Sequence, residues 1–411
     1  MKQAKMIDRR HHIAIAHAAF LGGGAEAVTL WALQALQSKY KTTLVTLLPV
    51  DLAECNDCYG TQIDARKIEV LPLFRRSKLA EHLYSHTSMF TLRQQILARA
   101  VRKRRKSFDL LISTYNEMDL GSSGIQYIHS PFFSAYSSEA RSILNFPDSL
   151  RRRFAKNFLG LLFGASERRL RQNLSITNSS WTASLLRKAC NLESQVLYPP
   201  VFFQEPMECP QQRRIDGFLC IGRFARDKRL ERAIEIIDRV RATGAQVNLR
   251  IVGNANDASY LMELEEIRKT RASWLTFEQK VSRSRLSELI REYNFGLQPR
   301  EAEQFGIAVA EMAIGGCIPF VPIEGGQAEI VGNDQQLSFS GADDAAGKIS
   351  RMMGDRNLQE QVRKTLHARQ QQFSPESFMT NFLQLVGDVL HQHPEKLVQY
   401  RKADADYIKD A

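Results

Sequence analysis

Two glutamates mark the segment with the clearest chemical potential. Residues 303–316 read Glu-Gln-Phe-Gly-Ile-Ala-Val-Ala-Glu-Met-Ala-Ile-Gly-Gly, which places Glu303 and Glu311 eight positions apart. From Ile307 to Ile314 every residue except Glu311 is apolar, and this pattern predicts a helix that is buried on all sides. A buried carboxylate is costly unless it is paired. Either the hydroxyl groups of a bound ligand or a nearby arginine would supply the partner.

Two cations are expected at the same edge of a sheet. Arg223 follows a strand predicted at 218–221, and Lys228 stands at the start of the next helix. The carboxyl ends of parallel strands share one edge, which also receives the Glu303 loop after a strand predicted at 295–299. Cations beside a helix N-terminus suit a diphosphate. Surface cations are also common at helix starts, so the pair by itself leaves both interpretations open.

A glycine loop and a histidine are the candidates in the first half. Gly22-Gly23-Gly24 follows the predicted first strand and opens a helix, where backbone N–H groups can approach an anion. The loop matches neither the dinucleotide fingerprint nor the P-loop, and such turns also serve geometry alone. His129 stands between a predicted strand and Ser130-Pro131, so it is either a core residue or part of a site.

Short apolar strands alternate with helical stretches, which is typical of parallel α/β sheets. A proline-marked connector from Tyr198-Pro199-Pro200 to Pro210 predicts a hinge between two such series. We expect a first domain over residues 1–200 and a second over 201–382, with a C-terminal helix over about 383–411 packing back on the first. Strands are expected at 12–16, 42–48, 110–113, 125–129, 175–177, 218–221, 249–252, 274–278, 295–299 and 318–322.

Composition favours a soluble globular protein. The chain has 411 residues and is 44% hydrophobic, yet no apolar run approaches the roughly 18 residues that a membrane span needs. Arg9-Arg10 and the Ala-rich run after it invite a signal-peptide interpretation, but interrupting histidines favour a first strand. Six scattered cysteines argue against a disulfide framework and for a reducing compartment. Cys55-Asn-Asp-Cys58 has no second Cys/His cluster nearby, which favours a polar loop over a zinc site.

The excess of positive over negative charge lies in the first half. Residues 1–200 hold 28 of the 56 Lys and Arg residues but only 15 of the 45 Asp and Glu residues. The run 102–106 closes a predicted amphipathic helix, while 151–153, Lys156 and 168–169 flank the apolar run 158–165. Such a surface suits anionic lipid or nucleic acid, or is a solvated basic face. Because the runs lack the interleaved aromatics of a single-strand reader, we expect contact with an anionic membrane and no nucleic-acid partner.

Several motifs together resemble those of family 4 retaining glycosyltransferases with the GT-B fold. The resemblance covers nearly the whole chain, and the motifs of the second half are specific as a set. They are Gly222-Arg223-x4-Lys228, Val252-Gly253, Glu303-x-Phe305-Gly306-x4-Glu311, Gly315-Gly316-Cys317-x-Pro319 and Gly325-Gly326-x-Ala328-Glu329-Ile330-Val331, together with 22–26, 127–131, 178–180 and 197–200 in the first half. The resemblance implies an α/β fold of two Rossmann-like, doubly wound parallel-sheet domains that face an interdomain cleft.

The resemblance also implies roles for individual residues. Glu303 would face the hydroxyls of the donor sugar, and Glu311 would hold the donor ribose. Arg223 and Lys228 would neutralise the departing diphosphate, which Gly23 and Gly24 would approach from the other domain. His129 would lie near the junction of sugar and acceptor. Gly253, Gly306 and Ile307 would complete the donor-binding set.

The implied enzyme is a retaining hexosyltransferase. It would move a hexose, with mannose as the specific candidate, from a nucleotide-diphosphate sugar to a lipid-linked or glycan acceptor at the membrane surface. No metal or other cofactor is expected, and the expected location is cytoplasmic, peripheral at the inner face of the membrane. The alternative is a nucleotide-sugar epimerase or another GT-B enzyme with a soluble acceptor. Gln304 and Arg300-Glu301-Ala302 depart from the family pattern, which predicts an unusual pocket around the sugar.

Overall fold

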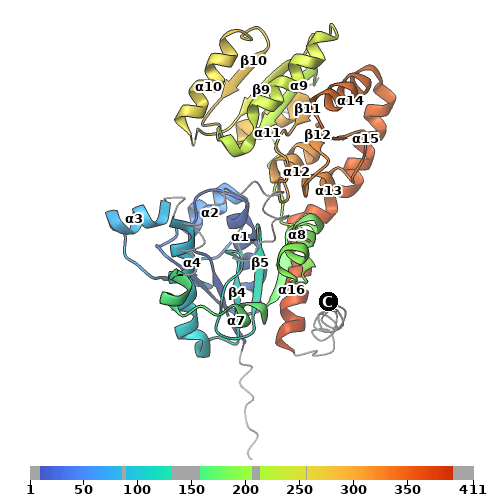
Figure 1. Ribbon diagram of the computed structural model, residues 1–411. Helices are drawn as coiled ribbons and strands as arrows, with labels where there is room; N and C mark the ends of the chain where they lie inside the picture. Colours follow the sequence, from blue (N-terminus) through green and yellow to red (C-terminus); the bar gives the residue numbers. More distant parts are fainter. Residues whose placement is uncertain (1–9, 86–88, 132–157, 206–212, 256, 392–411) are drawn as a thin grey trace, which may run out of the picture. The chain divides into compact units, whose positions relative to one another are not determined.

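The computed structural model describes residues 10–85, 89–131, 158–205, 213–255 and 257–391 (Figure 1). The chain forms two compact units, Met1–Pro200 together with Pro375–Ala411, and Val201–Ser374. The change of unit after Pro200 falls at the proline-marked connector. The segment that returns to the first unit begins at Pro375, earlier than the expected 383, because helix α16 (Pro375–Leu390) starts directly after the Ser374 signal.

The first unit is built on a seven-stranded parallel sheet with the order β3-β2-β1-β4-β5-β6-β7. Its strands are β1 (His12–Ala16), β2 (Lys41–Thr46), β3 (Ile68–Pro72), β4 (Leu110–Ser113), β5 (Ile125–Ile128), β6 (Leu174–Thr177) and β7 (Gln195–Val196). Its helices are α1 (Gly24–Leu36), α2 (Leu52–Tyr59), α3 (Lys78–Ser85), α4 (Phe90–Arg104), the short 3-10 turn η2 (Arg105–Ser107), α7 (Glu167–Arg171), α8 (Ser180–Cys190) and α16.

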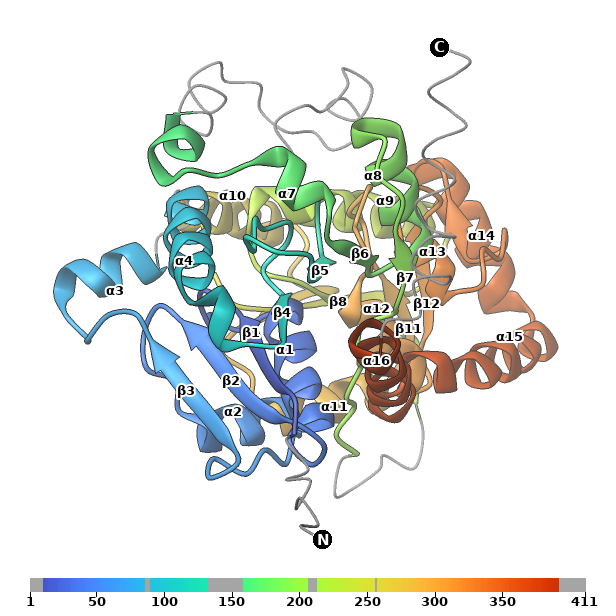
Figure 2. The same cartoon turned by 90° about the horizontal axis from the view of Figure 1, so that it is seen from below.

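The strands of this sheet are apolar and buried because helices cover them. In β4 and β5 every residue is buried, as expected for parallel strands covered on both faces. Helix α1 is buried along most of its length, and α16 packs against it (Figure 2). Phe378, Phe382 and Val386 are the fully buried apolar side chains of α16. The C-terminal helix is therefore part of the first unit's core.

The second unit is built on a six-stranded parallel sheet with the order β10-β9-β8-β11-β12-β13. The rings of Phe218, Phe295 and Phe320 line up across three neighbouring strands, with centroid distances of 5.0 and 6.2 Å. The strands are β8 (Arg214–Ile221), β9 (Asn248–Val252), β10 (Leu275–Glu278), β11 (Tyr293–Leu297), β12 (Ile318–Pro322) and β13 (Ser338–Phe339). The helices are η3 (Arg226–Lys228), α9 (Leu230–Ala242), α10 (Ala258–Lys269), α11 (Arg283–Glu292), α12 (Ile307–Ile314), α13 (Gln327–Ile330), α14 (Ala342–Gly354), α15 (Arg356–Arg369) and η4 (Gln370–Phe373).

The predicted fold class is confirmed, and the strands that were missed are at sheet margins. Each sheet is parallel and doubly wound. The sequence did not reveal β3, β7 or β13, which close the ends of the two sheets. Two of these strands have two residues each, too few to show a period.

The prediction of a polar loop at Cys55–Cys58 is wrong. These residues lie within α2, which Asp51 caps by accepting hydrogen bonds from the N–H groups of Ala53 and Glu54, and which ends at Gly60 in the left-handed conformation. Both cysteines are free thiols. The polar composition led to the wrong prediction, because α2 is indicated by its capping residues and not by the pattern of residues inside the helix.

Within the described ranges, every helix is too short or too polar to cross a bilayer.

Replacement of Phe382 tests the place of α16 in the first unit. Phe382→Ala removes a fully buried ring, so we expect a loss of about 3–5 kcal/mol in unfolding free energy. Asn381→Ala, at the exposed neighbouring position, is the matched control and should change stability by less than about 0.5 kcal/mol. Urea unfolding followed by circular dichroism measures both. Equal effects would show that α16 does not belong to the core.

Candidate active site

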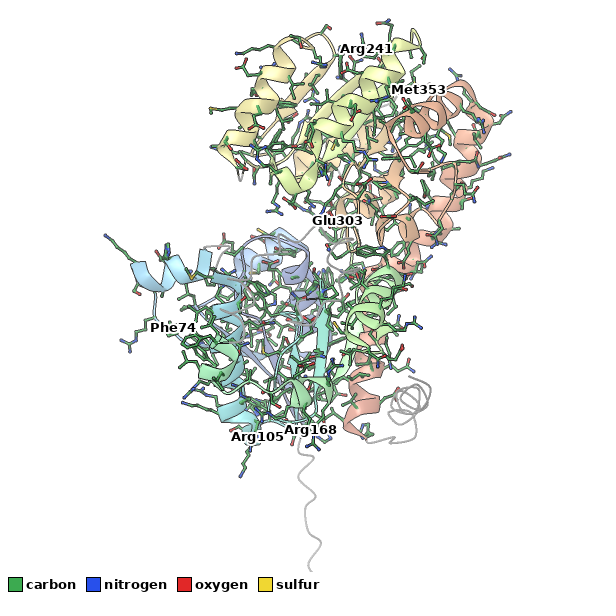
Figure 3. The ribbon with its side chains drawn as sticks, in the orientation of Figure 1. Phe74, Arg105, Arg168, Arg241, Glu303 and Met353 are labelled. Atoms are coloured by element: carbon green, nitrogen blue, oxygen red, sulfur yellow. The ribbon has the colours of Figure 1, made fainter. Side chains whose placement is uncertain are left out.

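Glu303, labelled in Figure 3, forms ion pairs with two cations of the second unit. Its carboxylate lies 2.7 Å from Nζ of Lys228 and 3.1 Å from the guanidinium of Arg300. The Glu303 side chain is only 13% exposed. Burial raises its pKa, but Lys228 and Arg300 outweigh that effect and lower the pKa to about 2. The carboxylate is therefore ionised at neutral pH and held between two cations.

The loop that carries Glu303 is fixed by the glycine motif at 325–326. Gly326 N–H donates to the carbonyl of Glu303 at 2.8 Å, and Glu303 and Gly325 form an isolated parallel bridge. Gly325 has a φ of +130°, and a Cβ there would lie 2.9 Å from the Glu303 carbonyl oxygen. The buried Gln327 donates from its side chain to the carbonyl of Arg300 at 2.7 Å. The motif therefore positions the carboxylate through the backbone.

The two predicted cations differ in their surroundings. Lys228 ends the 3-10 turn η3 after β8, and its side chain is 16% exposed in the contact with Glu303. Arg223 is 52% exposed and lies 3.6 Å from Asp227. Asp227 is also 3.4 Å from Arg300, so it links the two arginines at the edge of the cluster. Lys228 is thus held in place, whereas Arg223 is open to solvent and free to turn toward an anion.

Arg300 is a functional candidate whose role was not predicted from the sequence, where this residue is only a departure from the family pattern. The structure places it on Glu303 with N–O distances of 3.1 and 3.2 Å. The spacing of three residues was the available signal, but residues 300–303 form a turn and not a helix, so no periodicity argument applied.

Glu311 has a protein partner. Arg283 approaches its carboxylate at 2.8 Å, so the arginine that the sequence left open as a partner is present. The Glu311 side chain is 7% exposed, whereas that of Arg283 is 41% exposed. Burial raises the pKa of Glu311, and Arg283 opposes this only in part. The predicted ribose contact therefore stays a prediction, and it would need to share or displace an exposed guanidinium.

The two glycines of the second unit that were predicted to bind the donor, Gly253 and Gly306, have different surroundings. Gly306 has a φ of +98° and caps α12, whose first residue is Ile307. This helix N-terminus directly follows the Glu303 loop. Gly253 packs at the end of β9, where a Cβ would lie 2.0 Å from the carbonyl oxygen of Gly222, and its N–H already donates to the carbonyl of Glu278. The donor contacts of Gly306 and Ile307 stay predictions, and close packing gives Gly253 a structural role.

In the first unit the glycine loop lies against the buried carboxylate of Glu26. Gly23 caps α1, and its N–H donates to the hydroxyl of Tyr59 at 3.0 Å, while Gly24 is the first helical residue. Glu26 is buried and accepts a hydrogen bond from Leu21 N–H at 2.9 Å. A Cβ at Gly23 would lie 3.0 Å from the Glu26 carboxylate. Burial raises the pKa of Glu26, and backbone hydrogen bonds to its carboxylate oppose this in part.

His129 is held as a neutral imidazole directly after β5. Its Nε2 lies 3.1 Å from the carbonyl oxygen of Thr114, so Nε2–H donates and Nδ1 keeps its lone pair. Burial, with a smaller contribution from His17, lowers the pKa of His129 to about 3. The side chain of Asn116 accepts from the N–H groups of His129 and Ser130 at 2.7 and 3.1 Å. His129 is thus arranged to accept a hydrogen bond, and Asn116 is a positioning residue that the sequence did not reveal.

In the part of the chain that the structure describes, no group of three or more His, Cys, Asp or Glu side chains is arranged to hold a metal ion.

Residues 215–369 match the family model described as "Glycosyl transferases group 1", a range that contains Arg223, Lys228, Glu303 and Glu311. The chain is 22% identical over 241 residues to a GDP-Man:Man(3)GlcNAc(2)-PP-Dol alpha-1,2-mannosyltransferase of Dictyostelium discoideum, an alignment that covers 53% of this chain and 48% of that protein. A Candida glabrata protein of the same description is 25% identical over 169 residues, or 38% and 34% of the two chains. The chain spans about half the length of these curated relatives, or less.

Solved structures share the whole fold. A sucrose-phosphate synthase from Thermosynechococcus elongatus superimposes with a TM-score of 0.67 at 15% identity, covering 93% of this chain and 100% of that one. A glycosyltransferase from Rickettsia africae gives a TM-score of 0.65 at 13% identity, with 93% and 99% covered. These matches show the GT-B fold. The fold is the one that the motifs predicted, and the family match shows that much of the second unit is similar to glycosyltransferases, while assignment to family 4 and a retaining mechanism stay predictions.

The lowered pKa of Glu303 predicts how its contribution to stability varies with pH. Glutamate has an ordinary pKa of 4.5, and the folded value is about 2, so the extra stability is complete above pH 4.5 and is lost as the pH falls toward 2. The wild type should exceed Glu303→Gln by about 3 kcal/mol at neutral pH, and the gap should shrink in acid.

The control for this measurement is the neighbouring carboxylate. Glu301 is 47% exposed and pairs with Arg232, so Glu301→Gln should change stability little at any pH. Thermal unfolding of the full chain between pH 7 and pH 3 measures all three proteins. A gap between wild type and Glu303→Gln that is independent of pH would contradict the assignment of an ionised, paired carboxylate.

Proposed function

We propose that the chain transfers a hexosyl group from a nucleotide-diphosphate sugar to a lipid-linked or other glycan acceptor. The observation that carries this proposal is the cluster of Lys228, Arg300 and Glu303, which lies beyond the carboxyl ends of β8 and β11 within the range matching the glycosyltransferase family. Cations at this edge suit a nucleotide diphosphate, and a fixed carboxylate suits sugar hydroxyls.

In the proposed reaction the bond between the anomeric carbon and the diphosphate breaks, and a bond to an acceptor hydroxyl oxygen forms on the same face of the sugar. The departing diphosphate takes up the proton of that hydroxyl. Negative charge develops on the diphosphate, and Lys228 and Arg223 stabilise it. Since these cations supply the positive charge, we propose that no metal is needed. Glu303 orients the sugar through its hydroxyls, and Glu311 with Gly306 and Ile307 holds the nucleoside part.

The exposure of Arg223 gives it a specific part in this scheme. Lys228 is already paired with Glu303, whereas Arg223 is about half exposed beside Asp227 and can close on the diphosphate once the donor is present. His129, Gly23 and Gly24 belong to the first unit. The neutral His129 offers Nδ1 as an acceptor for a hydroxyl group.

The acceptor proposal rests on the relatives. Two of them are described as mannosyltransferases that use GDP-mannose and a dolichol-linked oligosaccharide, which supports mannose as the hexose and a lipid-linked acceptor. Such an acceptor lies at a membrane, so we propose a cytoplasmic enzyme that is peripheral at the inner face. The excess of Lys and Arg over Asp and Glu in residues 1–200 supports contact with an anionic surface.

Turnover of matched variants tests the proposed chemistry. Lys228→Ala and Glu303→Gln should each lower kcat/KM for transfer of a labelled sugar by two to three orders of magnitude, by roughly the amount that removal of a transition-state contact costs. Arg226→Ala and Glu301→Gln are the controls, because they remove the same charges from neighbouring exposed positions that pair with Glu263 and Arg232. Both controls should stay within about threefold of wild type.

Two results would overturn this assignment. Near-normal transfer by an Arg223→Ala, Lys228→Ala double variant would remove the diphosphate role. Interconversion of the labelled nucleotide sugar in the absence of any acceptor would identify an epimerase, since a transferase shows only slow hydrolysis there.

A further inference from the structure

A short helix in the first unit presents apolar side chains to solvent. Residues 158–163 are helical, and Phe158, Leu161 and Leu162 are 65%, 83% and 59% exposed. Their spacing of three and four residues places them on one face. Elsewhere in the described ranges, exposed large apolar residues such as Ile215 and Met262 are scattered singly. A clustered apolar face of this kind indicates contact with another apolar phase.

A basic pocket adjoins this helix. It has a volume of about 420 Å³ and is lined by Arg99, Arg102, Lys103, Arg105, Gly121, Phe163 and Arg169. The pocket and the helix are joined directly, because Arg102 donates to the carbonyl of Phe163 at 2.5 Å and Arg99 to that of Leu162 at 3.4 Å. Arg105, which lines the pocket, and Arg168 lie at the same edge of the first unit (Figure 3). The pocket itself holds five cationic side chains.

One carboxylate offsets part of this charge. The buried Asp119 binds Arg169 at 2.8 Å and Arg102 at 3.5 Å, which fixes the floor of the pocket. Within the described residues, Arg99, Lys103 and Arg105 have no carboxylate partner. The pocket therefore keeps a surplus of positive charge and a set of N–H donors in the arrangement that suits a phosphate group.

The pocket is not part of the candidate active site. Helix α4 ends at Arg104, before β4 begins, and Gly121 precedes β5, so the pocket lies at the amino ends of the strands. His129 and the glycine loop follow the carboxyl ends of β5 and β1. Strands of this length separate the two edges by roughly 13 Å. A donor or acceptor group at His129 would therefore leave this pocket unoccupied.

We propose that this surface docks on a membrane by binding the phosphate of an anionic glycerophospholipid in the pocket, while Phe158, Leu161 and Leu162 enter the acyl boundary. An anionic lipid is complementary to this surface. Its acyl chains can contact the apolar face while its anionic headgroup binds in the cationic pocket. A nucleic acid would bind the cations but leave the apolar face exposed. The proposal specifies the membrane contact named under Proposed function and does not depend on sugar transfer. The basic residues 151–153 and Lys156 lie outside the described residues and have no part in it.

Vesicle binding by the full chain tests the proposal. Wild type should sediment with phosphatidylcholine vesicles that contain one quarter phosphatidylglycerol, and much less with pure phosphatidylcholine. Arg99→Ala, Lys103→Ala should lower the partition coefficient by about 20-fold or more. Arg104→Ala, Lys106→Ala is the matched control, because it removes the same charge from the same segment at positions that do not line the pocket, and it should cost about threefold or less. Leu161→Asn, Leu162→Asn should also weaken binding.

The outcomes separate a defined pocket from diffuse charge. Equal losses for the two double variants would overturn the headgroup pocket, as would vesicle binding that is indifferent to phosphatidylglycerol. Full competition by a single-stranded oligonucleotide, with unchanged binding by the leucine variant, would assign the surface to nucleic acid instead. Each variant should keep the wild-type melting temperature and its transfer activity toward a soluble acceptor analogue, so loss of docking is distinguishable from failure of the proposed reaction.

Discussion

The charged state of Glu303 depends on two cations that enclose it. A carboxylate that is 13% exposed would ordinarily become neutral, and it stays ionised here because Lys228 and Arg300 lie within 2.7 and 3.1 Å. These three residues come from the ends of two neighbouring strands, β8 and β11, so the arrangement requires the parallel sheet to bring them to one edge. The glycine turn after β12 then fixes the Glu303 loop by backbone contact. The cluster is thus formed by the loops that follow three neighbouring strands, β8, β11 and β12, at one edge of the sheet.

The same cluster relates the ligand-free site to the proposed reaction. Lys228 is held by Glu303, and Arg223 is half exposed beside Asp227. An incoming diphosphate would compete for both cations, while the hydroxyls of a sugar could satisfy the carboxylate. Exchange of one set of charge-assisted bonds for another costs less than the creation of an unpaired charge. In this account the ion pairs prepare the site for its ligand.

Much of the fold followed from the sequence, because buried parallel strands are continuous apolar runs and the helices between them carry clear signals. The short strands β7 and β13 contain two residues each and give no periodic signal, and the α2 helix was hidden by its polar composition. In the site, Glu303 and Lys228 were predicted as separate roles, and the contact between them was not. Arg283, Arg300 and Asn116 were missed because each acts through a partner that is close only in space. Arginines are frequent on surfaces, so neither residue type nor spacing distinguished Arg283 and Arg300 from other surface arginines.

The most direct test of the central claim is the melting temperature of the full chain with a panel of UDP-, GDP- and ADP-sugars, measured for wild type and Lys228→Ala. A ligand that binds the native state raises the melting temperature, and at a given ligand concentration it does so more the tighter it binds. The account predicts that at least one nucleotide-diphosphate sugar raises the melting temperature of wild type by several degrees and that Lys228→Ala loses most of this shift. An equal shift in both proteins, or no shift with any donor, would contradict it.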